Sequence, residues 1–193
     1  MQPSPCIDLD DGRQTRLLVI ARQAIEVGFE TQRAPRIELA DHDDSLHSRA
    51  AAFVTLTQAG ALRGCVGSLE ASQALVQAVA DAAFSAAFRD RRFAPLAAAE
   101  LEATRIEISV LSAMEPIVVE SRQALLEQLR PGIDGLIIED RGRRATFLPK
   151  VWEHLPSAET FVDELLLKAG LDTGHWSPSL RLQRYSTQTF AEN

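Results

Sequence analysis

The sequence predicts an α+β fold, in which mixed or antiparallel sheets are packed by helices. Short segments with alternating apolar residues, typical of strands, stand next to one another and are separated by turn residues. Helical periodicity occurs in separate blocks, without the regular strand–helix alternation of a doubly wound sheet. The chain has 193 residues, of which 46% are hydrophobic and 24% charged. This length and composition suit one compact domain with a sizeable core.

The N-terminal part predicts a tail, a helix and a loop. Residues 1–14 are polar and aspartate-rich, so we expect a flexible tail. In residues 15–28 the apolar side chains recur at helical spacing, and Gly28 is the expected end of this helix. Residues 29–48 contain a proline and an acidic run and are expected to form an irregular loop.

Residues 51–57 and 62–69 predict two strands of a hairpin. The intervening Gln58-Ala59-Gly60 fits a three-residue loop, with Gly60 in the left-handed conformation. This loop pairs Thr55 with Arg63 across the hairpin. A two-residue loop would shift the register by one residue and exchange the faces.

The expected register sorts the hairpin side chains by polarity, as alternation along a strand requires. The face expected to join the core carries Val54, Leu56, Leu62 and Val66. The more polar face carries Phe53, Thr55, Thr57, Arg63 and Cys65.

Further elements are expected toward the C-terminus. Residues 72–88 predict an alanine-rich helix, whose small side chains permit close packing against a sheet. The other expected elements are a strand at 104–112, a short helix at 121–130, a hairpin of 136–138 with 145–148, a helix from Ser157 to Lys168 ended by Gly170, and a strand at 180–187.

The composition excludes several function classes. The net charge of −7 and the absence of a basic tract argue against nucleic-acid binding. No stretch approaches the length of a membrane span, and no secretory signal core is present. Two cysteines, Cys6 and Cys65, do not make a disulfide scaffold, so we expect a reducing, cytoplasmic location. Neither the dinucleotide-binding nor the P-loop glycine pattern occurs.

Cys65 is the sharpest candidate for chemistry. In the expected register Arg63 lies on the same face, roughly 6–7 Å along the strand. A nearby guanidinium favours the thiolate, the nucleophilic form of cysteine. Gly64 and Gly67 leave room for a ligand to approach the backbone. Cys65 is thus a nucleophile, part of a binding surface that also includes Thr55, or a small packed residue, and these alternatives stay open.

The turn after the alanine-rich helix adds a second group of candidates. Arg92 can bind a carboxylate or phosphate, with Asp90 orienting it and Phe93 beside it. The alternative is an ion pair that complements the helix end. Glu107 and Ser109, which share one face of their predicted strand, are either polar site walls or the solvent face of the sheet.

The histidines give little support to a catalytic or metal site. None of the four lies in the segment around Cys65, which weakens a Cys–His mechanism. His42 and His47 lie in an acidic loop whose spacing matches no metal motif, so we expect a solvated loop and no metal. The other two are His154 and His175.

Several separate motifs, in order, resemble the AMMECR family. The resemblance covers residues 15–190, expected to form one AMMECR-type domain, and implies an α+β fold with a larger and a smaller lobe. In bacteria the family includes component A of the AmmeMemoRadiSam system, so the resemblance also implies association with Memo-like and radical-SAM proteins. The motifs are FVTL (53–56), LRGCVG (62–67), AAFRDRRFAPL (86–96), EISVLS (107–112), GIDGLII (132–138), FLPKVW (147–152) and LLKAGL (166–171).

The resemblance carries no settled activity and no cofactor, so two functional hypotheses remain. The first is an accessory or binding component whose LRGCVG face and Asp90–Phe93 turn dock a partner or a small anionic ligand. The second is a cysteine-dependent transferase or hydrolase that uses Cys65.

Overall fold

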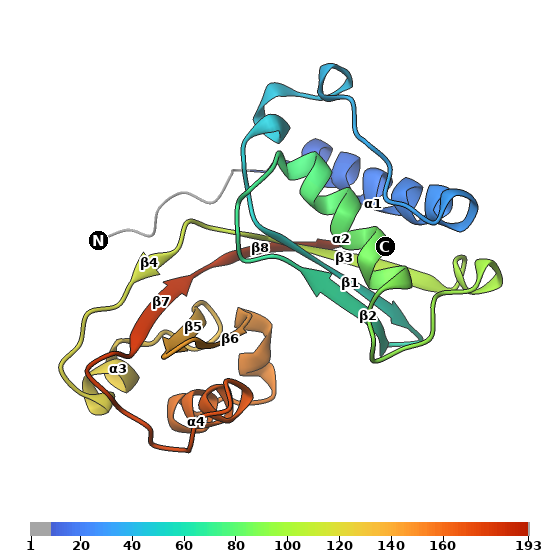
Figure 1. Cartoon of the computed structure of the whole chain (residues 1–193). Coiled ribbons are helices and arrows are strands. Elements are labelled where there is room, and N and C mark those ends of the chain that lie inside the picture. Colours follow the sequence, from blue (N-terminus) through green and yellow to red (C-terminus); the bar gives the residue numbers. More distant parts are fainter. Residues whose placement is uncertain (1–8, 193) are drawn as a thin grey trace. The chain divides into compact units, whose positions relative to one another are not determined.

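The computed structural model describes residues 9–192, which form an α+β fold (Figure 1). Within these residues there are four α-helices and two four-stranded antiparallel sheets, which confirms the predicted class. The contacts divide the described residues into two units: residues 112–187, and residues 9–111 together with 188–192. Each unit has its own hydrophobic core. No helix among the described residues is long and apolar enough to cross a membrane.

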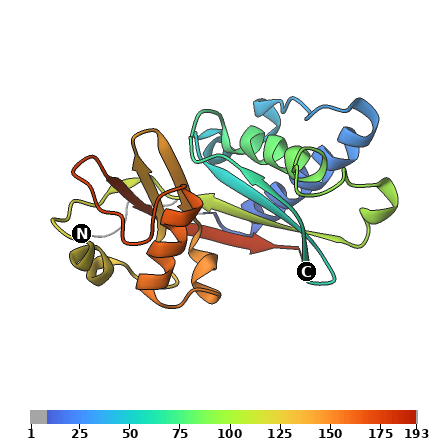
Figure 2. The same cartoon turned by 60° about the horizontal axis from the view of Figure 1, so that its bottom comes forward.

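The first sheet belongs to the larger unit, and two helices cover one of its faces (Figure 2). Its strands, in spatial order, are β2 (Ala61–Gly67), β1 (Ala52–Gln58), β3 (Thr104–Leu111) and β8 (Thr187–Ala191). The covering helices are α1 (Asp11–Thr31) and α2 (Leu75–Phe88). The side chains that face them are apolar and form the core: Val54, Leu56, Val66, Ile106, Ile108 and Val110. β8 was not predicted as a separate strand, because the last strand expected from the sequence ends at residue 187.

Helix α1 is longer at both ends than expected. Of the predicted tail, residues 1–8 with Cys6 lie outside the described part, while Leu9 is buried and the helix begins at Asp11. Gly28 does not end the helix: it lies inside it, where a Cβ atom would come within 2.5 Å of the Phe88 ring. The helix ends at Thr31, followed by a left-handed residue. Gly28 is therefore required by helix–helix packing.

The β1–β2 turn has two residues, which corrects the expected three-residue loop. Ala59 and Gly60 both have positive φ, 48° and 81°, as a type I′ turn requires. Thr57 therefore pairs with Leu62, which moves Leu62 off the core face. Leu62 is 43% exposed. Alanine rarely adopts the left-handed conformation, so the sequence favoured the longer loop.

A bulge in β2 then returns the later residues to the expected faces. The register shifts so that Leu56 pairs with Gly64, which leaves Arg63 as the extra residue. The expected pairing of Thr55 with Arg63 is wrong, since Thr55 pairs with Cys65. Thr55 and Cys65 nevertheless share a face, as predicted.

The second sheet forms the smaller unit with two helices. In spatial order its strands are β4 (Glu115–Pro116), β7 (Arg181–Tyr185), β5 (Gly135–Asp140) and β6 (Arg143–Phe147). The helices are α3 (Arg122–Gln128) and α4 (Ala158–Lys168). Trp152 stacks on Phe161 at 3.8 Å between ring centroids, at the centre of this core. The predicted hairpin, both helices and the strand near residue 181 are thus present, whereas β4 was not expected.

Short 3-10 helices lie in three of the connections: besides Ala98–Glu100, between α2 and β3, there are three more among residues 9–192. Two of them, Leu39–Asp41 and Asp44–His47, lie in the expected loop after α1. A third, Pro149–Glu153, begins at a proline, whose fixed φ suits the first position of a helix.

Candidate functional site

Two side chains from the turn after α2 bind the outer edge of β2 at Cys65. β2 is the edge strand of its sheet, so its outward backbone groups have no neighbouring strand. Asp90 Oδ2 accepts a hydrogen bond from the Cys65 backbone N–H at 2.9 Å. Arg92 Nη2 donates to the Cys65 carbonyl at 3.2 Å. The two side chains thereby replace, at one residue, the partners that a further strand would supply.

Asp90 and Arg92 also bind each other. Arg92 donates to Asp90 through Nε at 2.9 Å and Nη2 at 2.6 Å, and its backbone N–H donates to Oδ1. The Asp90 side chain is 6% exposed and that of Arg92 is 56% exposed. The hydrogen bond from Arg92, assisted by the N–H groups of Cys65 and Arg92, holds the pKa of Asp90 well below its usual range against the opposing effect of burial. Asp90 is therefore ionised and fixes the position of Arg92, whose side chain remains accessible to solvent.

The predicted neighbour Arg63 has a different partner. Its guanidinium makes two hydrogen bonds of 2.9 Å to the Glu100 carboxylate, and it donates further to the carbonyls of Ala94 and Pro95. The hydrogen bond from Arg63, followed by that from the Ala97 N–H, lowers the pKa of Glu100 to about 2. The Arg63 charge is thus neutralised by Glu100, which removes the argument that this residue activates the Cys65 thiol. Arg63 instead fastens the segment after α2 along the edge of β2.

The glycines of the LRGCVG segment serve close packing. A Cβ atom on Gly64 would lie 2.2 Å from the backbone oxygen of Ala86 in α2. A Cβ atom on Gly67 would lie 2.4 Å from the carbonyl oxygen of Ala52 in β1. Backbone atoms therefore occupy the space that a side chain would need at both positions, so both must be glycine for this packing.

The face of the sheet opposite the helices carries the Cys65 side chain. The Thr55 hydroxyl donates to Sγ at 3.4 Å, and Thr55 in turn pairs with Glu107 on β3. Ser109 is only 8% exposed and shares a hydrogen bond of 2.9 Å with Thr189 on β8, so it does not belong to a solvent face. Cys65 itself is partly exposed. One row on this face is therefore polar from Cys65 through Thr55 to Glu107, and the next row pairs Ser109 with Phe53.

Phe93 completes this surface. The Arg92 guanidinium lies over the Phe93 ring, 5.5 Å from its centroid, which fixes the cation from a further side. The structure thus brings together five of the predicted residues. We call them the Cys65 site: Thr55, Cys65, Asp90, Arg92 and Phe93.

The two histidines of the larger unit have other partners. His42 accepts from Arg16, and His47 contacts the Leu39 carbonyl and Asp44; in the smaller unit, His175 binds Asp140. No histidine among residues 9–192 hydrogen-bonds to the thiol, and the Asp90 carboxylate bonds to backbone and guanidinium instead. Within the same residues, no group of three or more His, Cys, Asp or Glu side chains could hold a metal ion.

Two features escaped the sequence reasoning. Glu100 holds Arg63 from 37 residues away, and no local pattern indicates that pairing. Asp140, fully buried in the smaller unit, accepts hydrogen bonds from His175, Ser177 and Ser179. Here a signal was available, because these three polar residues alternate with Trp176, Pro178 and Leu180 in the sequence.

Replacing Asp90 with asparagine is expected to lower the free energy of unfolding by about 1–2 kcal/mol, because charge-assisted bonds to Arg92 and Cys65 are lost. Urea denaturation measures the change. Asp41→Asn, at an exposed aspartate, is the matched control and should change stability by less than about 0.5 kcal/mol. Equal stability of both variants would contradict the anchoring role of Asp90.

Comparison with known proteins covers almost the entire chain. The AMMECR1 family model matches residues 18–190. A protein of Methanothermobacter thermautotrophicus is 38% identical over 190 residues, which span 95% of each chain. A protein of Saccharolobus solfataricus is 38% identical over 187 residues, covering 92% of this chain and 81% of that relative. The crystal structure of an uncharacterised protein from Pyrococcus horikoshii has 29% identity and a TM-score of 0.89, covering 96% of this chain and 94% of that one.

Proposed function

Since the chain belongs to the AMMECR1 family, we propose that it is a binding component whose Cys65 site docks a partner protein. The expected partners are Memo-like and radical-SAM proteins, as the family resemblance suggested. In this proposal the chain contributes recognition, and the partners supply the reaction.

The observation that carries the proposal is the state of Arg92. Its side chain is more than half exposed, yet Asp90, the Cys65 carbonyl and the Phe93 ring hold the guanidinium in one orientation. An exposed arginine that is already ordered loses little conformational entropy when it binds. Arginine and aromatic side chains are also the residue types that contribute most at protein interfaces. Arg92 and Phe93 therefore suit a docking surface for a partner protein.

The surroundings of the thiol favour recognition over nucleophilic catalysis. A cysteine nucleophile of the protease type needs a histidine base, whereas His42 and His47, the histidines of the same unit, bind other residues, and Arg63 is bound to Glu100. Thr55, which donates its hydroxyl to Sγ, is no base at neutral pH, and neither is Arg92, whose guanidinium also interacts with the thiol. In this proposal the thiol therefore contacts the partner and does not act as a nucleophile.

The test compares Arg92→Ala with Arg91→Ala, which removes the same charge from the neighbouring exposed position. Binding of the purified chain to a Memo-like protein and to a radical-SAM protein is measured by biolayer interferometry. We expect Arg92→Ala to weaken the affinity about tenfold or more and Arg91→Ala to change it less than about threefold. Equal effects of the two substitutions, or no binding by the unaltered chain, would refute the proposal.

The Cys65→Ser substitution separates contact from catalysis. In a Cys6→Ser background it keeps the size of the side chain and removes the thiol. We expect the affinity for the partner to stay within about threefold, because the Arg92 and Phe93 contacts remain. If instead the partner's reaction stops while binding is preserved, Cys65 takes part in the chemistry and the binding-only proposal fails.

A further inference from the structure

A cavity of about 400 Å³ lies in the smaller unit, beside the turn that joins β5 to β6. Small-molecule sites in proteins usually have volumes of about 300–1,000 Å³. Of the six residues that line this cavity, Leu171 is the one with an apolar side chain. The lining therefore suits a small ligand that is itself charged or strongly polar. Its other five residues are Asp140, Arg141, Arg143, Asp172 and His175.

The charged side chains of this lining include an excess of accessible cations. The Asp140 carboxylate is fully buried and already accepts hydrogen bonds from three side chains of the loop between α4 and β7. Asp172 is thus the one exposed anion, whereas Arg141 and Arg143 are both exposed. Among the described residues neither arginine forms an ion pair, and the Arg143 guanidinium donates to the Gly170 carbonyl. Two cations and one anion are therefore available to a ligand in the cavity.

The turn that carries Arg141 is not one that an arginine side chain favours. Arg141 and Gly142 both have positive φ, 49° and 80°, as in a two-residue type I′ turn. Glycine and asparagine adopt this conformation readily, whereas a longer side chain is strained in it. Within the part of the chain that the structure describes, the Arg141 side chain makes no hydrogen bond or ion pair that would compensate. Such strained residues cluster at functional sites, which supports a ligand-binding role for this guanidinium.

His175 adds a donor that depends on protonation. Its Nε2 lies 2.7 Å from Asp140 Oδ2, and because an ionised carboxylate only accepts hydrogen bonds, Nε2 carries a proton. The other ring nitrogen, Nδ1, makes no hydrogen bond to another described residue, and the side chain is 25% exposed. Nδ1 accepts in the neutral ring and donates in the imidazolium. The charged groups around it are those of the cavity lining, so a bound anion would favour the protonated ring.

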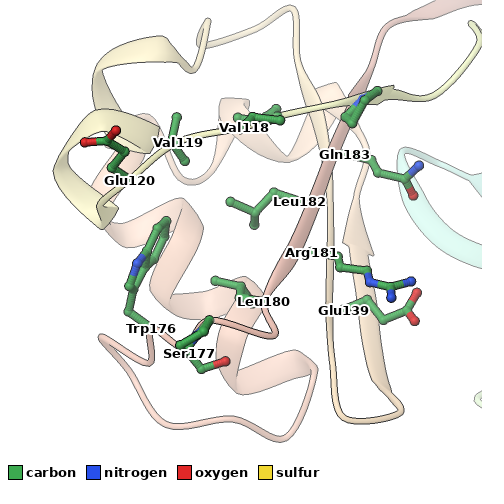
Figure 3. Close-up of a pocket in the computed structure, with 13 residues that line it drawn as sticks. Val118, Val119, Glu120, Glu139, Trp176, Ser177, Leu180, Arg181, Leu182 and Gln183 are labelled. Atoms are coloured by element: carbon green, nitrogen blue, oxygen red, sulfur yellow. The ribbon is translucent and has the colours of Figure 1, made fainter.

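The loop that carries His175 also borders a second cavity, of about 630 Å³, between residues 116–120 and 176–183 (Figure 3). Figure 3 shows Trp176, the residue after His175, at this second cavity. The charged residues of its lining are Glu120, Glu139 and Arg181, two anions and one cation. The excess of accessible cations is thus a property of the cavity beside His175 and is not shared by the larger one.

We propose that the cavity lined by Arg141, Arg143 and His175 binds the phosphate group of a small polar molecule, such as a polyol phosphate or a sugar phosphate. The three donors come from the β5–β6 turn, from β6 and from the loop before β7. They match the three terminal oxygens of a phosphate monoester, whereas a carboxylate offers two. The polar body of the ligand occupies the remaining volume. The site shares no residue with the Cys65 site.

The test titrates the full chain with glycerol 3-phosphate by isothermal titration calorimetry at about pH 7.5, where the phosphate group is mostly a dianion. We expect saturable binding, and no binding of glycerol, which lacks the phosphate group. Inorganic phosphate should bind at least about threefold more weakly, because it leaves most of the cavity unfilled. No binding of glycerol 3-phosphate, or equal affinity for glycerol or for inorganic phosphate, would overturn the proposal.

Substitutions separate the ligand contacts from folding. Asparagine tolerates positive φ, so Arg141→Asn should keep or raise the thermal midpoint and yet weaken binding about tenfold. Arg143→Gln should weaken binding to a similar extent. Arg144→Gln is the matched control, because Arg144 pairs with Glu139 and does not line the cavity, and it should change the affinity less than about threefold. Equal affinities of Arg141→Asn and Arg144→Gln would overturn the proposal.

Proton NMR tests the part played by His175. Its ring-proton signal is identified by its loss in the His175→Gln variant. At about pH 7.5 this signal should move toward its protonated position when glycerol 3-phosphate is added to the unaltered chain, because the phosphate oxygens favour the imidazolium. The signals of the other three histidines should not move. A His175 signal that stays in place at saturating ligand would overturn the proposal.

Discussion

Replacing Gly64 with alanine is expected to lower the free energy of unfolding by about 3 kcal/mol or more. The new Cβ atom would lie 2.2 Å from the backbone oxygen of Ala86. Overpacking usually costs about 1–3 kcal/mol when flexible side chains can move aside. Here the obstacle is the backbone of α2, so relief requires the whole helix to separate from β2. Guanidinium denaturation of the purified variant measures the loss.

The matched control is Gly12→Ala, in the first turn of α1. There a Cβ atom would meet only the Asp10 side chain at 3.5 Å, an ordinary contact, and alanine favours the helix. We expect this variant to be as stable as the unaltered chain or slightly more stable. If Gly64→Ala unfolds at the same denaturant concentration as Gly12→Ala, then β2 and α2 are not in close contact in solution.

Replacing Asp140 with alanine is expected to lower the thermal midpoint by roughly 6–12 °C, since His175, Ser177 and Ser179 lose their common acceptor inside the protein. Circular dichroism or scanning calorimetry measures the shift. Asp172→Ala, at an exposed aspartate of the same loop, is the control and should shift the midpoint by no more than about 2 °C. Equal midpoints for the two variants would show that Asp140 does not hold the loop.

The Asp140 effect should also depend on pH. The hydrogen bonds from Ser179 and His175 lower the pKa of Asp140 to about 2, below the value of about 3.9 expected in the unfolded chain. A depressed folded-state pKa contributes stability that is fully present above the unfolded pKa and is lost as pH falls through the folded pKa. The gap between the unaltered chain and Asp140→Ala should therefore be constant above about pH 5 and narrow between pH 4 and pH 2. A gap that does not change over this range would contradict the assignment.

Sequence periodicity predicted most of the fold because each helix and each long strand has a consistent apolar face. The register of the β1–β2 hairpin could not be predicted, because it depends on the left-handed conformation of Ala59 and on a bulge at Arg63. Alanine rarely adopts positive φ, and a bulge interrupts the regular pairing of a hairpin. The two-residue turn moves the side chains of β2 to the opposite face, and the bulge moves those after Arg63 back to the predicted face. Cys65 and Thr55 consequently share the predicted face, whereas Leu62 does not join the core.

The sequence predicted which residues belong to the candidate site better than it predicted the contacts between them. Cys65, Asp90 and Arg92 stood out as residue types suited to chemistry, and the structure brings them together. The partner of Arg63 could not be found, since Glu100 reaches it only after the chain has passed through α2 and the following turn. An ion pair between distant segments produces no periodic pattern in the sequence. The position of Arg63 two residues from Cys65 therefore did not show that its charge is paired with Glu100.

The capping of β2 by Asp90 and Arg92 has a consequence for the behaviour of the protein in concentrated solution. Unprotected strand edges recruit identical edges from other molecules and so promote aggregation. The outward N–H and C=O of Cys65 are both occupied, which interrupts such stacking near the middle of a seven-residue strand. Substitutions at Asp90 would thus endanger solubility during expression and storage, even where the folded molecule tolerates them.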